Sequence, residues 1–324
     1  MEGTVISSTG NWYEVAAEDG RPYLCKVKGN FRLKGVKTTN PVAVGDRVSF
    51  DYDAQISTGA PDTRGGWITA VGERSNCIIR KSVNLSKQTH ILAANIDRAF
   101  LVAGLTQPRT PQGFIDRFLV TGEAYHVPVC LVFNKSDLWG EEERLQFSEY
   151  RRIYGEAGYE VLQTSTASGE GMDGLREKMK KRTCLFAGNS GVGKSALIRY
   201  LEPNLDVRIG EISSTHRKGK HTTTYARMYP LSFGGYIVDT PGVKEFGMVQ
   251  LKTDELARYF PEMRAISGQC RFGNCTHEHE PGCAVKEALA EGKISSLRYN
   301  SYLNILHGEE VPVPGLIDNK NEKK

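Results

Sequence analysis

One segment of the chain has the residue types and spacing of a phosphate-binding loop. Residues 188–195 follow the pattern G-x-x-x-x-G-K-S without deviation, after an apolar strand and at the start of a helix. Glycines let backbone N–H groups surround phosphates, the lysine reaches the β and γ phosphates, and the serine hydroxyl ligates Mg²⁺. The predicted phosphate-binding residues are Gly188, Asn189, Ser190, Gly191, Val192, Gly193, Lys194, Ser195 and Ala196, with Ser195 also a magnesium ligand.

An earlier segment has the residues that read a guanine base. The carboxylate of Asp137 can accept hydrogen bonds from N1–H and the 2-amine of guanine, and adenine has neither donor. The stem of Lys135 can lie on the purine face, and Asn134 can bridge neighbouring loops. A strand that ends at 164–166 can add backbone contacts to guanine O6, which leaves little room for an ATPase. The predicted base-binding residues are Asn134, Lys135, Ser136, Asp137, Ser165 and Thr166.

The two motifs stand in an unusual order. In an ordinary P-loop GTPase the phosphate loop comes first and the base-reading motif last. Here the base-reading motif, at 134–137, precedes the phosphate loop, at 188–195. The order predicts a GTPase domain that has been circularly permuted.

Two further segments complete the predicted magnesium and γ-phosphate site. Asp239 follows an apolar strand, as does the Walker-B aspartate that holds Mg²⁺. The Gly242 amide can then contact the γ-phosphate. A long polar segment precedes this strand, and either Thr222 or Thr223 within it is expected to complete the Mg²⁺ shell.

The position after Gly242 holds Val243, where many small GTPases have a glutamine that orients the attacking water. A hydrophobic side chain cannot orient water, so another group must do so or basal hydrolysis must be slow. His221 is the candidate, because imidazole can orient water or accept its proton. The alternative is a histidine that faces solvent or RNA.

Four residues near the end of the chain form the pattern C-x4-C-x-H-x5-C. Three thiolates and an imidazole make a closed tetrahedral set of the structural zinc type, with no open position for catalysis. His279 competes with His277 as the fourth ligand, and three reduced cysteines without metal are the alternative reading. The predicted zinc ligands are Cys270, Cys275, His277 and Cys283.

Composition fits a globular protein of several domains. The chain has 324 residues, of which 39% are hydrophobic and 25% charged, and a net charge of +4 that is too small to indicate a partner. No apolar run of about 18 or more residues predicts a transmembrane helix, and residues 1–5 do not resemble a signal peptide. Seven cysteines, three of them clustered, suit a reducing compartment. We therefore expect a cytoplasmic location.

Residues 1–72 predict five short strands separated by glycine turns, as in a small closed β-barrel of the OB-fold type. Six basic residues and no acid lie between 21 and 37, interleaved with Tyr23 and Phe31. Aromatic rings that stack on bases beside cations that follow phosphates would suit nucleic acid. A solvated hairpin face with core aromatics is an equal alternative.

The rest of the chain divides into two predicted domains. Residues 73–248 alternate apolar strands and amphipathic helices from about 97 onward, which predicts a parallel α/β sheet with helices on both faces. Residues 249–324 predict helices around the cysteine cluster and a polar tail. The fold class is thus an N-terminal OB-fold, a central permuted α/β P-loop domain and a C-terminal helical zinc-binding domain.

With these motifs in this order, nearly the whole chain resembles the ribosome small-subunit-dependent GTPase A family, RsgA. The resemblance implies GTP hydrolysis stimulated by the small (30S) ribosomal subunit, late in its maturation, and contacts of the barrel and zinc domain with 16S rRNA. It also implies that His221 is catalytic, since the family has a valine-like residue after the switch II glycine. A monomer without membrane contact is the simplest expectation.

Two other functional classes were weighed. A GTP-gated RNA-binding assembly chaperone, in which hydrolysis is incidental, is kept open by the absent glutamine. A metabolic P-loop kinase would need a phosphoacceptor site and would leave the motif at 134–137 unexplained.

Overall fold

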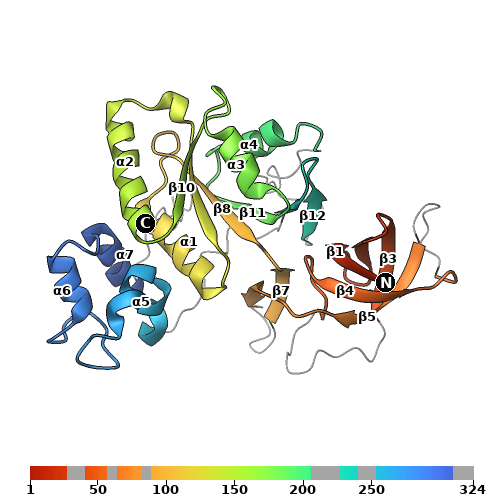
Figure 1. Cartoon of the computed structure of the whole chain (residues 1–324), viewed down its shortest axis with the longest axis horizontal. Coiled ribbons are helices and arrows are strands. Elements are labelled where there is room, and N and C mark those ends of the chain that lie inside the picture. Colours follow the sequence, from red (N-terminus) through yellow and green to blue (C-terminus); the bar gives the residue numbers. More distant parts are fainter. Residues whose placement is uncertain (28–40, 57–63, 82–88, 206–225, 240–252, 309–324) are drawn as a thin grey trace, which may run out of the picture.

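The computed structural model describes residues 1–27, 41–56, 64–81, 89–205, 226–239 and 253–308 (Figure 1). A barrel of strands, a mixed sheet flanked by helices and a group of short helices follow one another along the chain. Among the described helices, none combines the length and apolar composition that a membrane crossing requires.

Five strands form the predicted N-terminal barrel. Their order is β1-β2-β3-β5-β4, and β4 pairs back onto β1, so the sheet closes. Alternate side chains, such as Val5, Val15 and Cys25, point into a buried core. The strands are β1 (Glu2–Ser8), β2 (Tyr13–Ala17), β3 (Pro22–Val27), β4 (Arg47–Tyr52) and β5 (Arg64–Val71).

A hairpin that the sequence analysis missed joins the barrel to the next domain. It consists of β6 (Cys77–Lys81) and β7 (Thr89–Ala94), which pair antiparallel. Side-chain hydrogen bonds fix both its ends, because Asn76 holds the backbone of Ile96 while the Asn95 amide donates to the Gly45 carbonyl of the barrel. The joint is therefore made of specific polar contacts.

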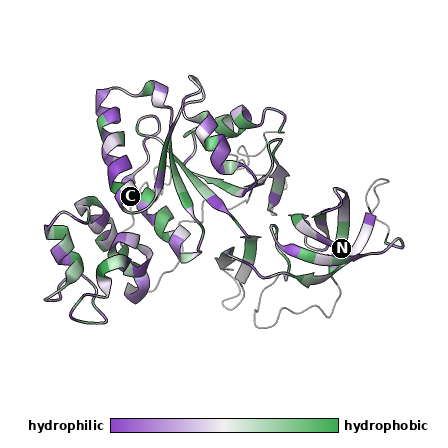
Figure 2. Cartoon of the chain, viewed as in Figure 1, coloured by the Kyte–Doolittle hydropathy of each residue, from purple (hydrophilic) through white to green (hydrophobic). Residues whose placement is uncertain are grey.

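The central domain has the parallel sheet that the sequence predicts. Strands run in the order β10-β9-β8-β11-β13, all parallel, and antiparallel β12 follows at the end. Figure 2 shows the middle strands as hydrophobic along their length, as expected for strands covered on both faces. The strands are β8 (Arg98–Ala103), β9 (Val129–Asn134), β10 (Glu160–Thr164), β11 (Thr183–Ala187), β12 (Arg227–Pro230) and β13 (Tyr236–Asp239).

Helices flank this sheet, and one of them was not predicted. The helix α2 has acidic residues in its first turn and buries Phe147, Tyr150 and Tyr154. This i, i+3, i+7 spacing is the signal that would have revealed it. The helices of this domain are α1 (Gln112–Ala124), α2 (Glu141–Glu156), α3 (Met172–Met179) and α4 (Lys194–Leu201), with the 3₁₀ turn η1 (Ser136–Leu138).

Strand β12 also contacts the barrel. Ser7 of β1 is paired with Arg227 of β12, and the Arg227 side chain reaches Glu14 at 3.5 Å. One eleven-stranded sheet therefore runs through both domains.

The C-terminal region is helical, as predicted, with two differences. Residues 253–259 form a 3₁₀ helix instead of an α-helix, and the helix at 261–267 was missed, since its proline at the first position resembles a loop. These elements enclose a core that includes Phe260, Met263 and Tyr302. They are η3 (Thr253–Tyr259), α5 (Pro261–Ser267), α6 (Ala284–Ala290) and α7 (Ser296–Leu306).

A buried ion-pair network fastens this helical region to the central domain. The guanidinium of Arg298, on α7, donates to Asp116 of α1 at 2.6 Å and to Glu262 of α5 at 2.7 Å. The side chains of Arg298 and Asp116 are 1% and 0% exposed. Burial alone lowers the pKa of Arg298, but the charges of the two carboxylates outweigh burial and raise it. The arginine is therefore charged and paired.

Candidate nucleotide site and metal centre

The phosphate loop leaves the end of β11 and enters α4, which is the predicted strand-loop-helix context. Three of its glycines have positive φ: Gly188, Gly191 and Gly193. A Cβ at Gly188 would lie 2.2 Å from the carbonyl oxygen of Val102, and one at Gly193 would lie 2.3 Å from the Asn134 amide nitrogen. Only glycine fits these positions, so the loop closes tightly against its neighbours.

The lysine of this loop lies over its own backbone. The Lys194 ammonium donates hydrogen bonds to the carbonyls of Gly188 at 2.7 Å and Asn189 at 2.8 Å. Lys194 and Ser195 are both half-buried in the first turn of α4. Their polar groups are thus held where the helix N-terminus favours an anion.

Asn134 joins the base-reading motif to the phosphate loop. Its buried amide donates to the Val192 carbonyl at 2.9 Å and accepts from the Thr164 hydroxyl at 3.0 Å. The ends of β9, β10 and β11 therefore meet through one side chain. The two motifs, more than 50 residues apart in the sequence, form one edge of the sheet.

The other base-reading residues are also held in place. Lys135 has a left-handed backbone (φ 65°), and its ammonium donates to the Gln107 carbonyl at 2.7 Å. The Ser165 hydroxyl lies 2.5 Å from a carboxylate oxygen of Asp137, whose side chain is exposed. The Gln107 contact was not foreseen, because nothing in the spacing places the loop after β8 beside this motif.

The predicted magnesium aspartate ends a strand adjacent to the phosphate loop. Asp239 is the last residue of β13, which pairs with β11. Burial raises the pKa of this carboxyl, and a nearby cation would favour its ionised form. His221, Thr222, Thr223, Gly242 and Val243 lie outside the described residues.

The cysteine and histidine cluster comes together in the C-terminal region. The ligand atoms of Cys270, Cys275, His277 and Cys283 all lie within 4.8 Å of one another. Nδ1 of His277 is 3.6 Å from the Cys270 sulfur and 3.4 Å from the Cys283 sulfur. A tetrahedral ion with bonds of about 2.0–2.3 Å spaces its ligands by roughly 3.3–3.8 Å. The residues therefore fit a closed four-ligand metal site.

The structure also decides between the two candidate histidines. His277 is buried, whereas the His279 side chain is 86% exposed and lies against Glu278. Burial lowers the pKa of His277, which favours the neutral imidazole that binds metals.

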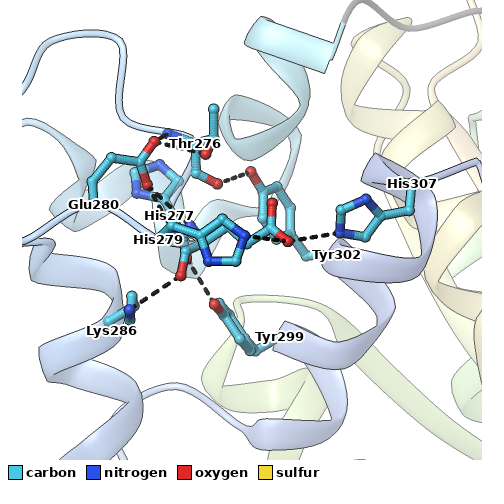
Figure 3. A network of polar contacts seen from close by, with 9 residues as sticks. Thr276, His277, His279, Glu280, Lys286, Tyr299, Tyr302 and His307 are labelled. Carbon is cyan, nitrogen blue, oxygen red and sulfur yellow. Dashed lines mark hydrogen bonds and ion pairs between the residues drawn. The ribbon is translucent and has the colours of Figure 1, made fainter.

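Polar contacts from α7 hold the loop that carries His277. Figure 3 shows Tyr299 and Tyr302 directed at this loop, where their hydroxyls donate to the carbonyls of His277 and Thr276 at 2.7 and 2.6 Å. Glu280 accepts from the backbone N–H and hydroxyl of Thr276, and these bonds lower the pKa of Glu280 to about 2. The loop is therefore fixed by contacts outside the ligands themselves.

Known proteins resemble this chain over almost its full length. Residues 71–249 match the family model described as RsgA GTPase, and residues 2–58 match the RsgA N-terminal domain. A protein of Christiangramia forsetii named small ribosomal subunit biogenesis GTPase RsgA is 50% identical, over 96% of this chain and 97% of its own. A protein of the same name from Bacteroides fragilis is 49% identical, with the same coverage.

Solved structures agree with these matches. The crystal structure of YjeQ from Thermotoga maritima superimposes with a TM-score of 0.74 at 34% identity, and covers 95% of this chain and 97% of its own. YloQ, titled a circularly permuted GTPase, gives a TM-score of 0.71 at 26% identity, with 95% and 94% coverage. The chain therefore belongs to the RsgA family of GTP-hydrolysing enzymes, and the permuted motif order at its nucleotide site is the order of that family.

Proposed function

We propose that this chain hydrolyses GTP during late maturation of the small (30S) ribosomal subunit, at the site where the phosphate loop meets the base-reading motif. The observation that carries this proposal is the Asn134 amide, which hydrogen-bonds the phosphate loop on one side and β10 on the other. The relatives' name, small ribosomal subunit biogenesis GTPase, supplies the partner.

In this proposal each motif has a separate task. Asp137 reads guanine, Lys135 covers the base, and backbone groups of Ser165 and Thr166 contact O6. The loop from Gly188 to Ala196 surrounds the phosphates. Ser195 and Asp239 hold Mg²⁺, joined by Thr222 or Thr223, and the ion when bound neutralises charge that develops on the phosphates. The Gly242 amide contacts the γ-phosphate.

We assign the orientation of the attacking water to His221. Its support is the valine at position 243, which cannot do so, together with the ability of imidazole to hold or accept a proton of water. A weak water-orienting group would keep basal hydrolysis slow, and a partner would then accelerate it.

The flanking domains are proposed to hold RNA. We assign residues 1–72 to the barrel, 73–248 to the GTPase domain and 249–324 to the zinc domain, and propose that the first and last contact 16S rRNA. In the barrel, Lys26 lies 4.2 Å above the ring of Trp12, which pairs a cation with a stacking surface. A cytoplasmic monomer is the simplest form of this protein.

We predict that the metal of the C-terminal site is zinc, at about one ion per chain. Cys283→Ala should lose most of the metal and unfold the short helices around it, because metal binding there replaces a larger core. His279→Ala is the matched control and should keep the metal, since that side chain lies outside the cluster. Metal content and thermal unfolding of both variants check this. A metal-free, fully folded wild-type chain would remove the zinc site.

The proposed function is tested by GTP turnover with and without purified small subunits, with large subunits as the control. We expect slow turnover alone and an increase of about 10-fold or more with small subunits only. Turnover that stays slow while binding to small subunits depends on GTP would support the alternative, a GTP-gated RNA-binding assembly chaperone.

A further inference from the structure

A glutamate outside the predicted site connects the two segments that read the base. Glu170 ends the loop that follows β10, and its carboxylate accepts a hydrogen bond from the Ser136 hydroxyl at 2.7 Å. Its other oxygen accepts from the side-chain amide of Gln163, on β10, at 2.9 Å. Ser136 itself is buried and stands directly between Lys135 and Asp137. The carboxylate therefore ties the base-reading motif to the strand beside it.

A second hydrogen bond runs parallel to this one. The Ser165 hydroxyl accepts from the backbone N–H groups of Ala167 and Ser168, at 3.1 and 3.2 Å. Its own proton is therefore directed to the Asp137 carboxylate, 2.5 Å away. Two consecutive residues of the motif, Ser136 and Asp137, are thus held by the same loop.

The loop does not need the Glu170 side chain to close. The backbone N–H of Ser165 donates to the Glu170 carbonyl at 3.0 Å, and that of Gly169 donates to the Ser165 carbonyl at 3.0 Å. The next residue, Gly171, turns the chain with φ at 70°, where a Cβ would lie 1.9 Å from the Gln163 carbonyl. Because backbone contacts shape the loop, the carboxylate is available to act on Ser136.

We propose that Glu170 is a positioning residue for guanine recognition. By holding Ser136 it fixes the rotation of the short 3₁₀ turn from Ser136 to Leu138, and so the direction of the Asp137 carboxylate. Removing a charge-assisted hydrogen bond of this kind leaves the turn with more orientations. The inference rests on the proposed function of Asp137 as the reader of the 2-amine and N1–H of guanine.

The test compares two nucleotides on the full chain. Inosine diphosphate has N1–H but no 2-amine, so the ratio of its Kd to that of GDP reports how well Asp137 is aimed. Glu170→Ala should weaken GDP binding by about 10-fold and lower the preference for GDP over inosine diphosphate by about 3-fold or more. Glu170→Gln should restore most of the preference, because its amide oxygen still accepts from Ser136.

Two controls separate positioning from general damage. Glu177→Ala removes an exposed glutamate that pairs only loosely, at 3.6 Å, with Lys180, and should change neither value. Ser136→Ala removes the same hydrogen bond from the other side, so the double variant with Glu170→Ala should be no weaker than the weaker single variant.

The outcomes are distinct. An unchanged GDP affinity in Glu170→Ala, or equal weakening of both nucleotides, would overturn the positioning role while the proposed function stands. A wild-type chain that binds both nucleotides equally would instead remove the assignment of Asp137, and the inference with it.

Discussion

Asp137→Asn is expected to reverse the base preference of the nucleotide site. Asparagine offers one acceptor and one donor, so it can pair with N1–H and the 2-carbonyl of xanthine but not with both donors of guanine. Two charge-assisted hydrogen bonds are lost with guanine. We therefore predict that GDP binding weakens by roughly 100-fold or more, while xanthosine diphosphate binding strengthens.

Equilibrium binding of both diphosphates to the wild type and the variant measures this reversal. Asp173→Asn, in the first turn of α3, is the control that changes an aspartate outside the predicted site. If Asp137→Asn still prefers GDP by the wild-type margin, Asp137 does not read the base.

The second large effect is expected on stability. Arg298→Met should destabilise the chain by about 3–5 kcal/mol, because it leaves the carboxylate of Asp116 buried without its partner. The arginine also lies 4.6 Å from the centre of the Phe260 ring, so its flat group fills space that methionine fills differently. Urea unfolding, followed by fluorescence and by proteolysis of the C-terminal helices, measures the change.

A matched control exists on the same interface. Arg264 pairs with Glu123 of α1 at 2.8 Å, but its side chain is 52% exposed. Arg264→Met should therefore cost only about 0–1 kcal/mol. Adding Asp116→Asn to Arg298→Met should recover part of the loss, since the buried charge is then gone. Equal costs for Arg298→Met and Arg264→Met would show that the buried network does not anchor the zinc domain.

Local patterns carried most of what could be predicted. The phosphate loop needs glycines and a lysine at fixed spacing beside a strand and a helix, so eight consecutive residues indicate both chemistry and fold. The strands of the central sheet are continuous apolar runs, which single them out. The family matches and solved structures confirm the permuted fold class.

Long-range contacts could not be predicted in the same way. Asp116 and Arg298 are 182 residues apart, and neither stands in a pattern that marks it as buried. Glu170 lies in an exposed loop where a glutamate needs no special reason. The helix α2 is a different case, because its apolar spacing was present but was not used. Local spacing equally could not decide between His277 and His279, which only the folded loop separates.

The measurement that tests the account most directly is hydrolysis by Asp137→Asn with small subunits present. If the described site performs the reaction, the variant should hydrolyse xanthosine triphosphate with the stimulation by small subunits that the wild type shows with GTP, and its GTP turnover should fall at low nucleotide concentration. Unchanged GTP turnover, or xanthosine triphosphate turnover that small subunits do not affect, would contradict the claim that guanine recognition at Asp137 and subunit-stimulated hydrolysis belong to one site.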